Sequence, residues 1–228
     1  MPTGPELRLN KFLAERLGIS RRQADDLIAK GKISVNGKVA TLGTHIDKSS
    51  KVCYNSRMVP YSMEYTYLAF YKPVGYVCSK KRQGETPTIF ELLPKQYQNL
   101  KTVGRLDKDS SGLILLTNDG DFAFQHTHPK FSKEKQYEVT LNRALEPLHQ
   151  QMIADFGVDL PDGKSRLGLN KQSDDRKKWL VLMSEGRNRQ IRRTFEALGY
   201  SVKKLHRIQF GKYRLAGLKP GQFVEFKV

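Results

Sequence analysis

The sequence predicts an α+β fold in two parts. Residues 1–62 are expected to form a small helix-turn-helix module with short β strands, and residues 63–228 a larger domain with a mixed, mainly antiparallel sheet flanked by helices. The first expectation depends on apolar residues at helical spacing, followed by β patterns around an Asn-Gly turn. The second depends on strand and helix patterns that mix irregularly after residue 65, unlike the regular alternation of a parallel α/β sheet.

Two short helices are expected within residues 8–30. In "RLNKFLAERLG", four apolar residues recur at helical spacing, and Gly18 is placed as a C-cap. In "SRRQADDLIAKG", Ser20 and Gln23 fit a capping box, and Gly31 ends the helix.

Short strands follow the two helices. "KISVNGKVAT" is typical of a hairpin with an Asn-Gly turn, and "KVCYNSRMV" of a further strand. Residues 1–60 contain eleven Lys or Arg and five Asp or Glu, a net charge of 11 − 5 = +6. A basic helix-turn-helix with a small sheet suits a separate RNA-binding module, although the same cations could form a solvated helix face.

In the larger part, the elements are assigned from the apolar patterns. Strands are expected at 66–71, 112–117, 135–141, 179–184 and 200–210, and helices at 88–93, 120–126, 147–155 and 188–198.

The charge of the chain indicates the kind of partner. Lys+Arg 40 against Asp+Glu 23 gives a net charge of +17, which favours a polyanion, most often nucleic acid. Cys53 and Cys78 form no CxxC pair, so a disulfide framework and the common zinc spacings are excluded, and a reducing cytoplasm is favoured. No apolar run approaches the ~18 residues of a membrane span, and we expect a soluble cytosolic protein without a membrane partner.

Several classes of chemistry lack their motifs. The sequence has no Walker loop, GxGxxG, GxSxG or HExxH, so phosphoryl transfer, nucleotide-cofactor redox chemistry and zinc peptidase activity have no support. His126 and His128 lack an obvious further ligand, and we assign no metal to them.

The stretch "GRLDKDSSGLILL" combines charged, turn-forming and apolar residues. Asp, Ser and Gly are what a loop entering a buried strand requires. These local rules favour an ordinary turn and do not distinguish Asp107 from Asp109 as a reacting group.

"SEGRNRQIRRTFEALGY" predicts a helix that ends at Gly199 and has arginines crowded into its first turns. Cations there oppose the helix macrodipole, which indicates an anionic partner: phosphates, a carboxylate or both. A solvated basic face is the alternative. The arginines are Arg187, Arg189, Arg192 and Arg193.

Two further segments have structural readings on pattern alone. "EKQYEVTL" alternates like a half-buried strand, which makes Tyr137 a core aromatic. "KPVGYVCS" places Lys72 in a turn after an apolar strand.

Together, these segments resemble the signature of the bacterial RsuA/RluB/RluE/RluF-type ribosomal RNA pseudouridine synthases. "KPVGYVCS", "GRLDKDSSGLILLTNDGD", "HP…EKQYEVTL" and "EGRNRQIRRTFEALGYSVKKLHRIQFG" occur in the family's order over most of residues 66–211. The first sixty residues resemble the RNA-binding module first known from small-subunit ribosomal protein four, which this family carries at its N-terminus.

The resemblance implies an RNA isomerase that turns a uridine into pseudouridine without metal or organic cofactor. It makes Asp107 the catalytic carboxylate, Arg192 its ion-pair partner, and Tyr137 the tyrosine that stacks on the target base; it gives Asp109 no such role. An arginine beside a carboxylate favours the ionised form of the carboxylate. The target uridine is expected to be flipped out of its stack. RNA contacts are expected from Arg8, Lys11, Arg21, Arg22, Lys30, Lys72, Arg105, Arg187, Arg189 and Arg193, with loop contacts as the other role for Lys72 and Arg105.

The expected partner is ribosomal RNA or a partly assembled ribosomal subunit, bound by a monomer. "NRQIRR" resembles more closely the members that act on large-subunit RNA. Two alternatives are a non-catalytic RNA-binding ribosome assembly factor and a DNA-binding helix-turn-helix protein, the latter leaving the second domain unexplained.

Overall fold

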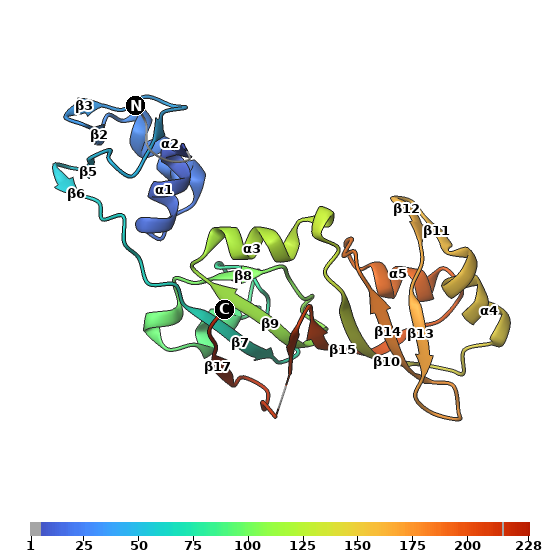
Figure 1. The fold of residues 1–228 in the computed structure, drawn as a ribbon. Coiled ribbons are helices and arrows are strands. Elements are labelled where there is room, and N and C mark those ends of the chain that lie inside the picture. Colours follow the sequence, from blue (N-terminus) through green and yellow to red (C-terminus); the bar gives the residue numbers. More distant parts are fainter. Residues whose placement is uncertain (1–5, 216) are drawn as a thin grey trace. The chain divides into compact units, whose positions relative to one another are not determined.

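The computed structural model describes residues 6–215 and 217–228. The chain forms two compact units, one consisting mainly of the residues before Tyr67, the other of Tyr67–Thr117 and Asp121–Val228 (Figure 1).

The N-terminal unit has the two expected helices, α1 (Leu9–Arg16) and α2 (Arg21–Ala29). The capping box is present: Gln23 N–H donates to Ser20 Oγ at 3.2 Å, and Ser20 N–H donates to Gln23 Oε1 at 2.9 Å. Gly18 and Gly31 both end helices with φ +67°, a conformation that favours glycine.

A small sheet completes this unit, in the order β3-β2-β5-β6. Its strands are β2 (Ile33–Val35), β3 (Lys38–Val39), β5 (Val52–Tyr54) and β6 (Arg57–Met58), and a separate pair joins β1 (Leu7–Arg8) to β4 (His45–Ile46). The core is made by the apolar faces of both helices with the inner strand residues: Leu9, Phe12, Leu13, Ala24, Ile28, Ile33 and Val52 are all buried.

The second unit is built on one large sheet with the path β13-β14-β10-β15-β9-β7-β17. The strands of this path are β7 (Tyr67–Lys72), β9 (Ser111–Thr117), β10 (Lys135–Leu141), β13 (Gly168–Lys171), β14 (Lys178–Met183), β15 (Val202–Phe210) and β17 (Phe223–Glu225). β8 (Lys101–Val103) pairs with β9, and β16 (Tyr213–Arg214) pairs with β15. The β9–β15 pairing is parallel and the other ladders of this sheet are antiparallel, so the predicted mixed, mainly antiparallel sheet is confirmed.

β9 lies inside the sheet and is buried on both faces. Leu113 and Leu115 pack in one cluster with Phe122 of α3 (Gly120–Thr127), which lies over β8 and β9 in Figure 1. Ile114 and Leu116 pack in the other cluster, which includes residues of α5 (Gln190–Glu196). A strand covered on both faces needs an unbroken apolar run, which explains "LILL".

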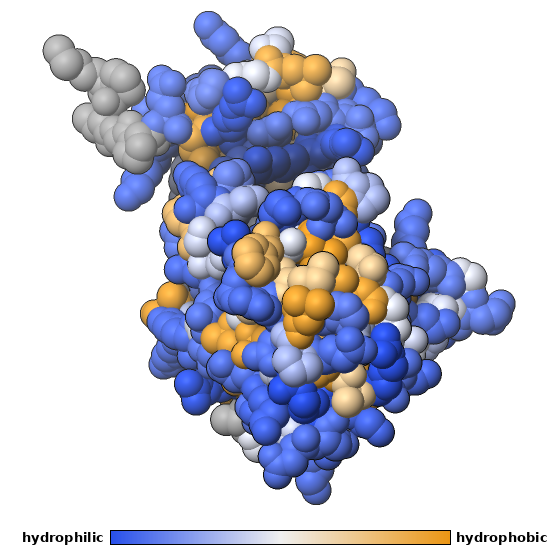
Figure 2. All heavy atoms as spheres, turned by 90° about the vertical axis from the view of Figure 1, so that its right-hand side faces the viewer, coloured by the Kyte–Doolittle hydropathy of each residue, from blue (hydrophilic) through white to orange (hydrophobic). Residues whose placement is uncertain are grey.

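The remaining elements are short. They are the 3₁₀ turns η1 (Ile89–Leu92), η2 (Lys95–Tyr97) and η3 (Pro129–Phe131), the helix α4 (Pro147–Gln151), the π turn η4 (Met152–Phe156), and the hairpin of β11 (Val158–Leu160) and β12 (Gly163–Ser165). The helix expected at 88–93 is therefore a 3₁₀ turn, and the one at 147–155 divides into α4 and η4. Seen from the side on which α4 lies in Figure 1, the surface is mostly hydrophilic with patches of apolar side chains (Figure 2).

The helix expected at 188–198 begins only at Gln190. Arg189 has φ +47° and ψ +30° and stands before the helix as its N-cap. The Arg187 N–H donates to the Gln190 side chain at 3.2 Å, which closes the turn before the helix. Of the four arginines predicted in the first turns, only Arg192 and Arg193 are helical, so fewer cations oppose the macrodipole than the sequence suggested.

No helix in the described part of the chain combines the length and the apolar character that crossing a membrane requires.

Candidate active site

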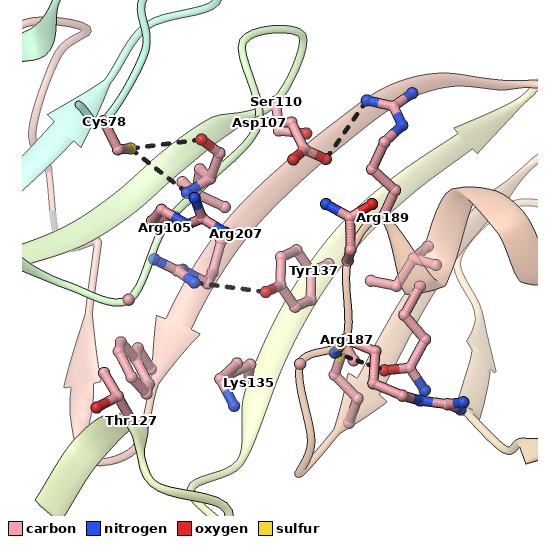
Figure 3. A pocket seen from close by; sticks show the side chains of 18 of the residues that line it. Cys78, Arg105, Asp107, Ser110, Thr127, Lys135, Tyr137, Arg187, Arg189 and Arg207 are labelled. Carbon is pink, nitrogen blue, oxygen red and sulfur yellow. Dashed lines mark hydrogen bonds and ion pairs between the residues drawn. The ribbon is translucent and has the colours of Figure 1, made fainter. Parts of the chain in front are cut away.

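A cavity of about 830 Å³ opens in the second unit where β9, β10 and β15 lie side by side. Its walls come from four segments that are distant in sequence: residues 77–83, the loop 104–110, the segment 126–137, and residues 183–191, with Leu205, Arg207 and Phe210 of β15. Figure 3 shows Asp107, Arg189, Tyr137 and Arg207 facing this space. The three motifs of the sequence that contain Asp107, Tyr137 and the arginine cluster therefore meet at one site.

The side chain of Lys72 holds the loop that carries Asp107. The Lys72 side chain is fully buried, and its Nζ donates to the carbonyl oxygens of Ser110 at 2.6 Å, Pro73 at 3.0 Å and Lys108 at 3.5 Å. Burial lowers the pKa of this amine from 10.5 to about 8, although the carboxylates of Asp107 and Asp109 favour its charged form. Lys72 thus makes a loop contact, one of its two expected roles, and its contact with RNA stays a prediction.

Cys78 holds the residue immediately before Asp107. Its Sγ accepts from the Leu106 N–H and donates to the Leu106 carbonyl, both at 3.4 Å (Figure 3). Burial raises the pKa of the thiol, so it stays protonated and can donate. Nothing in the sequence singles out Cys78, because a lone cysteine carries no pairing signal.

The arginine beside Asp107 is Arg189. Arg189 Nη1 lies 3.6 Å from Asp107 Oδ2, and the Asp107 side chain is one-third exposed (Figure 3). Arg189 also pairs with Asp109, its Nη1 lying 3.2 Å from Asp109 Oδ1.

Arg192, the expected partner of Asp107, instead pairs with Asp109. Its Nε lies 3.3 Å from Asp109 Oδ2, and its two other nitrogens donate to backbone: Nη2 to the Asp109 carbonyl at 2.9 Å and Nη1 to the Val202 carbonyl at 2.8 Å. The side chain is only 11% exposed, so it is fixed between β15 and the loop. The Asp107–Arg192 pairing is thus corrected: Arg192 clamps the loop, and Arg189, projecting from the turn before α5, reaches Asp107.

Burial and the neighbouring charges shift the pKa values of both Asp109 and Arg192. Burial raises the pKa of Asp109, but the hydrogen bond from Arg189 and the charge of Arg192 outweigh it, so the pKa lies below 3.8. Burial lowers the pKa of Arg192, against the effect of Asp109. Asp109 is therefore a structural anion that organises both arginines.

Tyr137 is both a core residue and part of the cavity wall. It is 7% exposed, packs in the larger hydrophobic cluster, and directs its hydroxyl toward Arg207 (Figure 3). Arg207 Nη1 donates to Tyr137 Oη at 3.5 Å, and Arg207 Nε donates to the Leu113 carbonyl at 2.7 Å. The pattern-based expectation of a core aromatic and the family-based expectation of a pocket residue are compatible.

Arg207 is the residue that sequence reasoning missed. It is 2% exposed, and among the described residues its Nη2 has no hydrogen-bond partner although that atom is buried. Arg207 lies in "KLHRIQFG", inside the segment that resembles the family. Polar and apolar residues are mixed in this part of β15, so the pattern does not predict that the Arg207 side chain is buried.

Two arginines expected to contact RNA are engaged within the protein. Arg187 donates to the carbonyls of Asp162, Gly163 and Lys164 at 2.8–2.9 Å. Arg193 binds the Asp162 carboxylate at 2.7 and 3.1 Å, and this hydrogen bond lowers the pKa of Asp162. Both side chains hold the β11–β12 turn against α5, because a guanidinium has five donors and this turn offers acceptors. Both side chains thus have a structural role, and their expected contact with RNA stays a prediction.

The other expected RNA contacts lie on surfaces. Arg105 is exposed and lines the cavity. In the N-terminal unit Arg8, Arg21, Arg22 and Lys30 are exposed, and Lys11 is half-buried.

His126 and His128 lie in different surroundings. His126 Nδ1 lies 2.9 Å from the Phe122 carbonyl, and burial lowers the pKa of His126. His128 is exposed, and its Nδ1 accepts from the Lys130 N–H. In the described ranges, no three His, Cys, Asp or Glu side chains are grouped so that they could hold a metal ion.

Comparisons with known proteins identify the family of the chain. Residues 66–197 match the RNA pseudouridylate synthase family, and residues 7–52 match the S4 domain. The ribosomal small subunit pseudouridine synthase A of Pasteurella multocida is 37% identical, over 92% of this chain and 90% of that protein. The ribosomal large subunit pseudouridine synthase B of Bacillus subtilis is also 37% identical, over 94% and 89%.

A solved structure gives the same result for the fold. A crystal structure of a pseudouridylate synthase superposes with a TM-score of 0.69 at 33% identity, covering 97% of this chain and 96% of that one. The chain therefore belongs to the RNA pseudouridylate synthase family, as an isomerase with an N-terminal S4 domain.

Proposed function

We propose that this protein converts a specific uridine of ribosomal RNA to pseudouridine, with Asp107 as the catalytic carboxylate. The observation that carries the proposal is the convergence of Asp107, Arg189, Tyr137 and Arg207 on one cavity. The ribosomal substrate is supported by the names of both relatives that are 37% identical.

The reaction rearranges one nucleoside without oxidation or reduction. The bond from ribose C1′ to uracil N1 breaks, a bond from C1′ to C5 forms, the C5 proton leaves, and N1 gains a proton. Such a reaction needs an anionic group beside C1′, acting as nucleophile or base, and a way to move the proton. Asp107 is the anion, and Arg189 fixes its carboxylate and balances its charge.

Tyr137 is proposed to lie against the uracil ring and to take part in the proton transfer. Guanidinium has donors only, so the contact with Arg207 uses the oxygen of Tyr137 as acceptor and leaves its O–H proton free to turn into the cavity. The target base has to leave its stack to reach this depth, as in other enzymes that act on a base.

We assign RNA binding to residues 1–62 and the reaction to residues 63–228. The basic helices of the first segment supply the electrostatic attraction to phosphate. The working substrate is RNA of the large subunit, because of "NRQIRR", presented free or in a partly assembled subunit to a cytoplasmic monomer. The two relatives with 37% identity are named for different subunits, so both RNAs belong in the test.

The test is incubation of the protein with each unmodified ribosomal RNA, with pseudouridine mapped by carbodiimide treatment and primer extension. We expect one or a few sites to appear with the wild type and none with Asp107→Asn. Asp109→Asn is the matched control, because it removes a neighbouring carboxylate that we assign to loop structure; it should retain measurable activity. If Asp107→Asn is as active as wild type, Asp107 is not the catalytic group.

A further inference from the structure

The far wall of the cavity continues into an exposed cluster of aromatic rings. Phe124 in α3 is 46% exposed, Phe131 in η3 is 36% exposed, and His128 between them is exposed as well. The ring centroids of Phe124 and His128 are 4.7 Å apart, those of Phe124 and Phe131 5.8 Å, and those of His128 and Phe131 6.4 Å. We call these three residues the aromatic cluster.

The aromatic cluster is held in place by its backbone. The His128 N–H donates to the Phe124 carbonyl at 2.9 Å, which extends α3, and the Phe131 N–H donates to the His128 carbonyl at 3.1 Å. Ser132 then turns the chain away with φ +43° and its N–H bonded to the Pro129 carbonyl. Rings on a fixed frame are prepared for a ligand at little cost in conformational entropy.

The cluster borders the active site through one of its members. His128 and Pro129 line the same cavity as Asp107 and Tyr137. At about 830 Å³, this cavity is near the upper end of the range for small-molecule pockets, about 300–1,000 Å³, so it has room beyond one nucleotide. A strand of RNA whose uridine occupies the end near Asp107 would leave along this wall.

The charge beside the rings suits RNA. Lys130 Nζ lies 4.7 Å from the Phe131 ring centroid and 5.3 Å from that of Phe124. Lys133 lines the cavity next to them. Aromatic rings with interleaved cations form the usual surface for unpaired nucleotides, on which bases stack while the cations meet the phosphates. A contiguous exposed aromatic group on a soluble protein is also a mark of a binding site.

We propose that the aromatic cluster is a stacking site for an unpaired base that flanks the target uridine. Flipping a uridine breaks its stacking with its neighbours, and a neighbouring base that stacks on Phe131 recovers part of that free energy. The site thus selects RNA in which the nucleotide beside the target is unpaired. This inference rests on the proposed function, because it assumes a uridine at Asp107.

The test uses substitutions of Phe131 in the full-length protein. Phe131→Ala and Phe131→Leu remove the ring, and Phe131→Trp keeps one. Leu148→Ala is the matched control: Leu148 is 63% exposed on α4 and does not line the cavity. Urea unfolding of each variant first establishes that the fold is intact.

For pseudouridine formation in unmodified ribosomal RNA, we expect KM to rise about tenfold in Phe131→Ala and Phe131→Leu, a change that corresponds to about 1.4 kcal/mol. The single-turnover rate at saturating RNA should stay within about twofold, since stacking at this distance acts on binding. Phe131→Trp and Leu148→Ala should keep the wild-type KM. A wild-type KM in Phe131→Ala overturns the inference.

Fluorescence provides a readout that needs no turnover. The natural protein has one tryptophan, Trp179, which is 1% exposed, so an indole placed by Phe131→Trp can be distinguished as the accessible one. At fixed salt, a single-stranded RNA should quench it and the same sequence in a duplex should not. Equal quenching by both overturns the stacking site, and so does a KM effect seen only on ribosomal particles, which would indicate a protein partner.

The two hypotheses fail differently. If the wild type forms pseudouridine and both Phe131→Ala and Phe131→Leu keep its KM, the stacking site is wrong and the proposed function stands. If the wild type forms none in ribosomal RNA but unpaired RNA still quenches the Phe131→Trp variant, the proposed function is wrong and the RNA site stands.

Discussion

The backbones of Gly112 and Arg207 lie in direct contact. A β-carbon at position 112 would be 2.2 Å from the carbonyl oxygen of Arg207 and 2.6 Å from its amide nitrogen, and Gly112 itself has φ +110°. This contact is the parallel pairing of β9 with β15, and β15 pairs with β10 on its other side. The glycine after the Asp107 loop therefore brings that loop next to Arg207, which contacts Tyr137.

Gly112→Ala should destabilise the protein by more than about 3 kcal/mol, because the added methyl group meets backbone that cannot move aside. Gly75→Ala is the control, since Gly75 also has positive φ, +94°, but open space around it. It should cost only the backbone strain, about 1–2 kcal/mol. Urea unfolding of both variants measures the difference; equal costs would show that the β9–β15 approach is not tight.

Changing Arg189 to Gln should lower activity, whereas changing Arg192 to Gln should lower stability. Arg189→Gln removes the ion pair with Asp107 from a side chain that is 44% exposed, so we expect kcat to fall about a hundredfold with little loss of stability. Arg192→Gln leaves the carbonyls of Asp109 and Val202 without their donors, so the free energy of unfolding should fall by about 2–3 kcal/mol. Kinetics on ribosomal RNA and urea unfolding are measured for both. If Arg192→Gln lowers kcat more than Arg189→Gln does and leaves stability unchanged, Arg192 is the partner of Asp107.

The features that the sequence could predict are those with a local physical signal. The capping box at Ser20, the turn glycines and the doubly buried run of β9 each follow from neighbouring residues. Roles that depend on contacts between residues far apart in the sequence could not be predicted from neighbouring residues. The sequence pattern places Lys72 in a turn and does not predict its burial. Its side chain binds three carbonyl oxygens, two of which belong to residues 36 and 38 positions away. Likewise, Arg187 binds a turn about 25 residues earlier in the chain, a pairing that no spacing rule indicates.

Arg207 should act on the reaction through Tyr137. Arg207→Met and Tyr137→Phe are each expected to lower kcat at least about tenfold, with KM for ribosomal RNA changed less than about threefold, since both alter proton transfer more than binding. If Arg207 works by orienting the Tyr137 hydroxyl, the double variant should be no slower than the slower single variant. Multiplied losses in the double variant would mean that Arg207 acts independently, through its buried Nη2.

Lys72 should make stability depend on pH in a defined window. Its pKa is about 8 in the folded protein and 10.5 when unperturbed, so between these values the unfolded chain binds more protons than the folded one. Stability from this group therefore rises with pH above about 8, as the cost of burying a charged amine is relieved. Lys72→Met lacks this contribution and keeps the other titrating groups. The difference in the free energy of unfolding, wild type minus Lys72→Met, should grow by about 2 kcal/mol from pH 7 to pH 9.5 in urea titrations. A difference that stays constant would mean that the amine under the Asp107 loop keeps its ordinary pKa and is not desolvated.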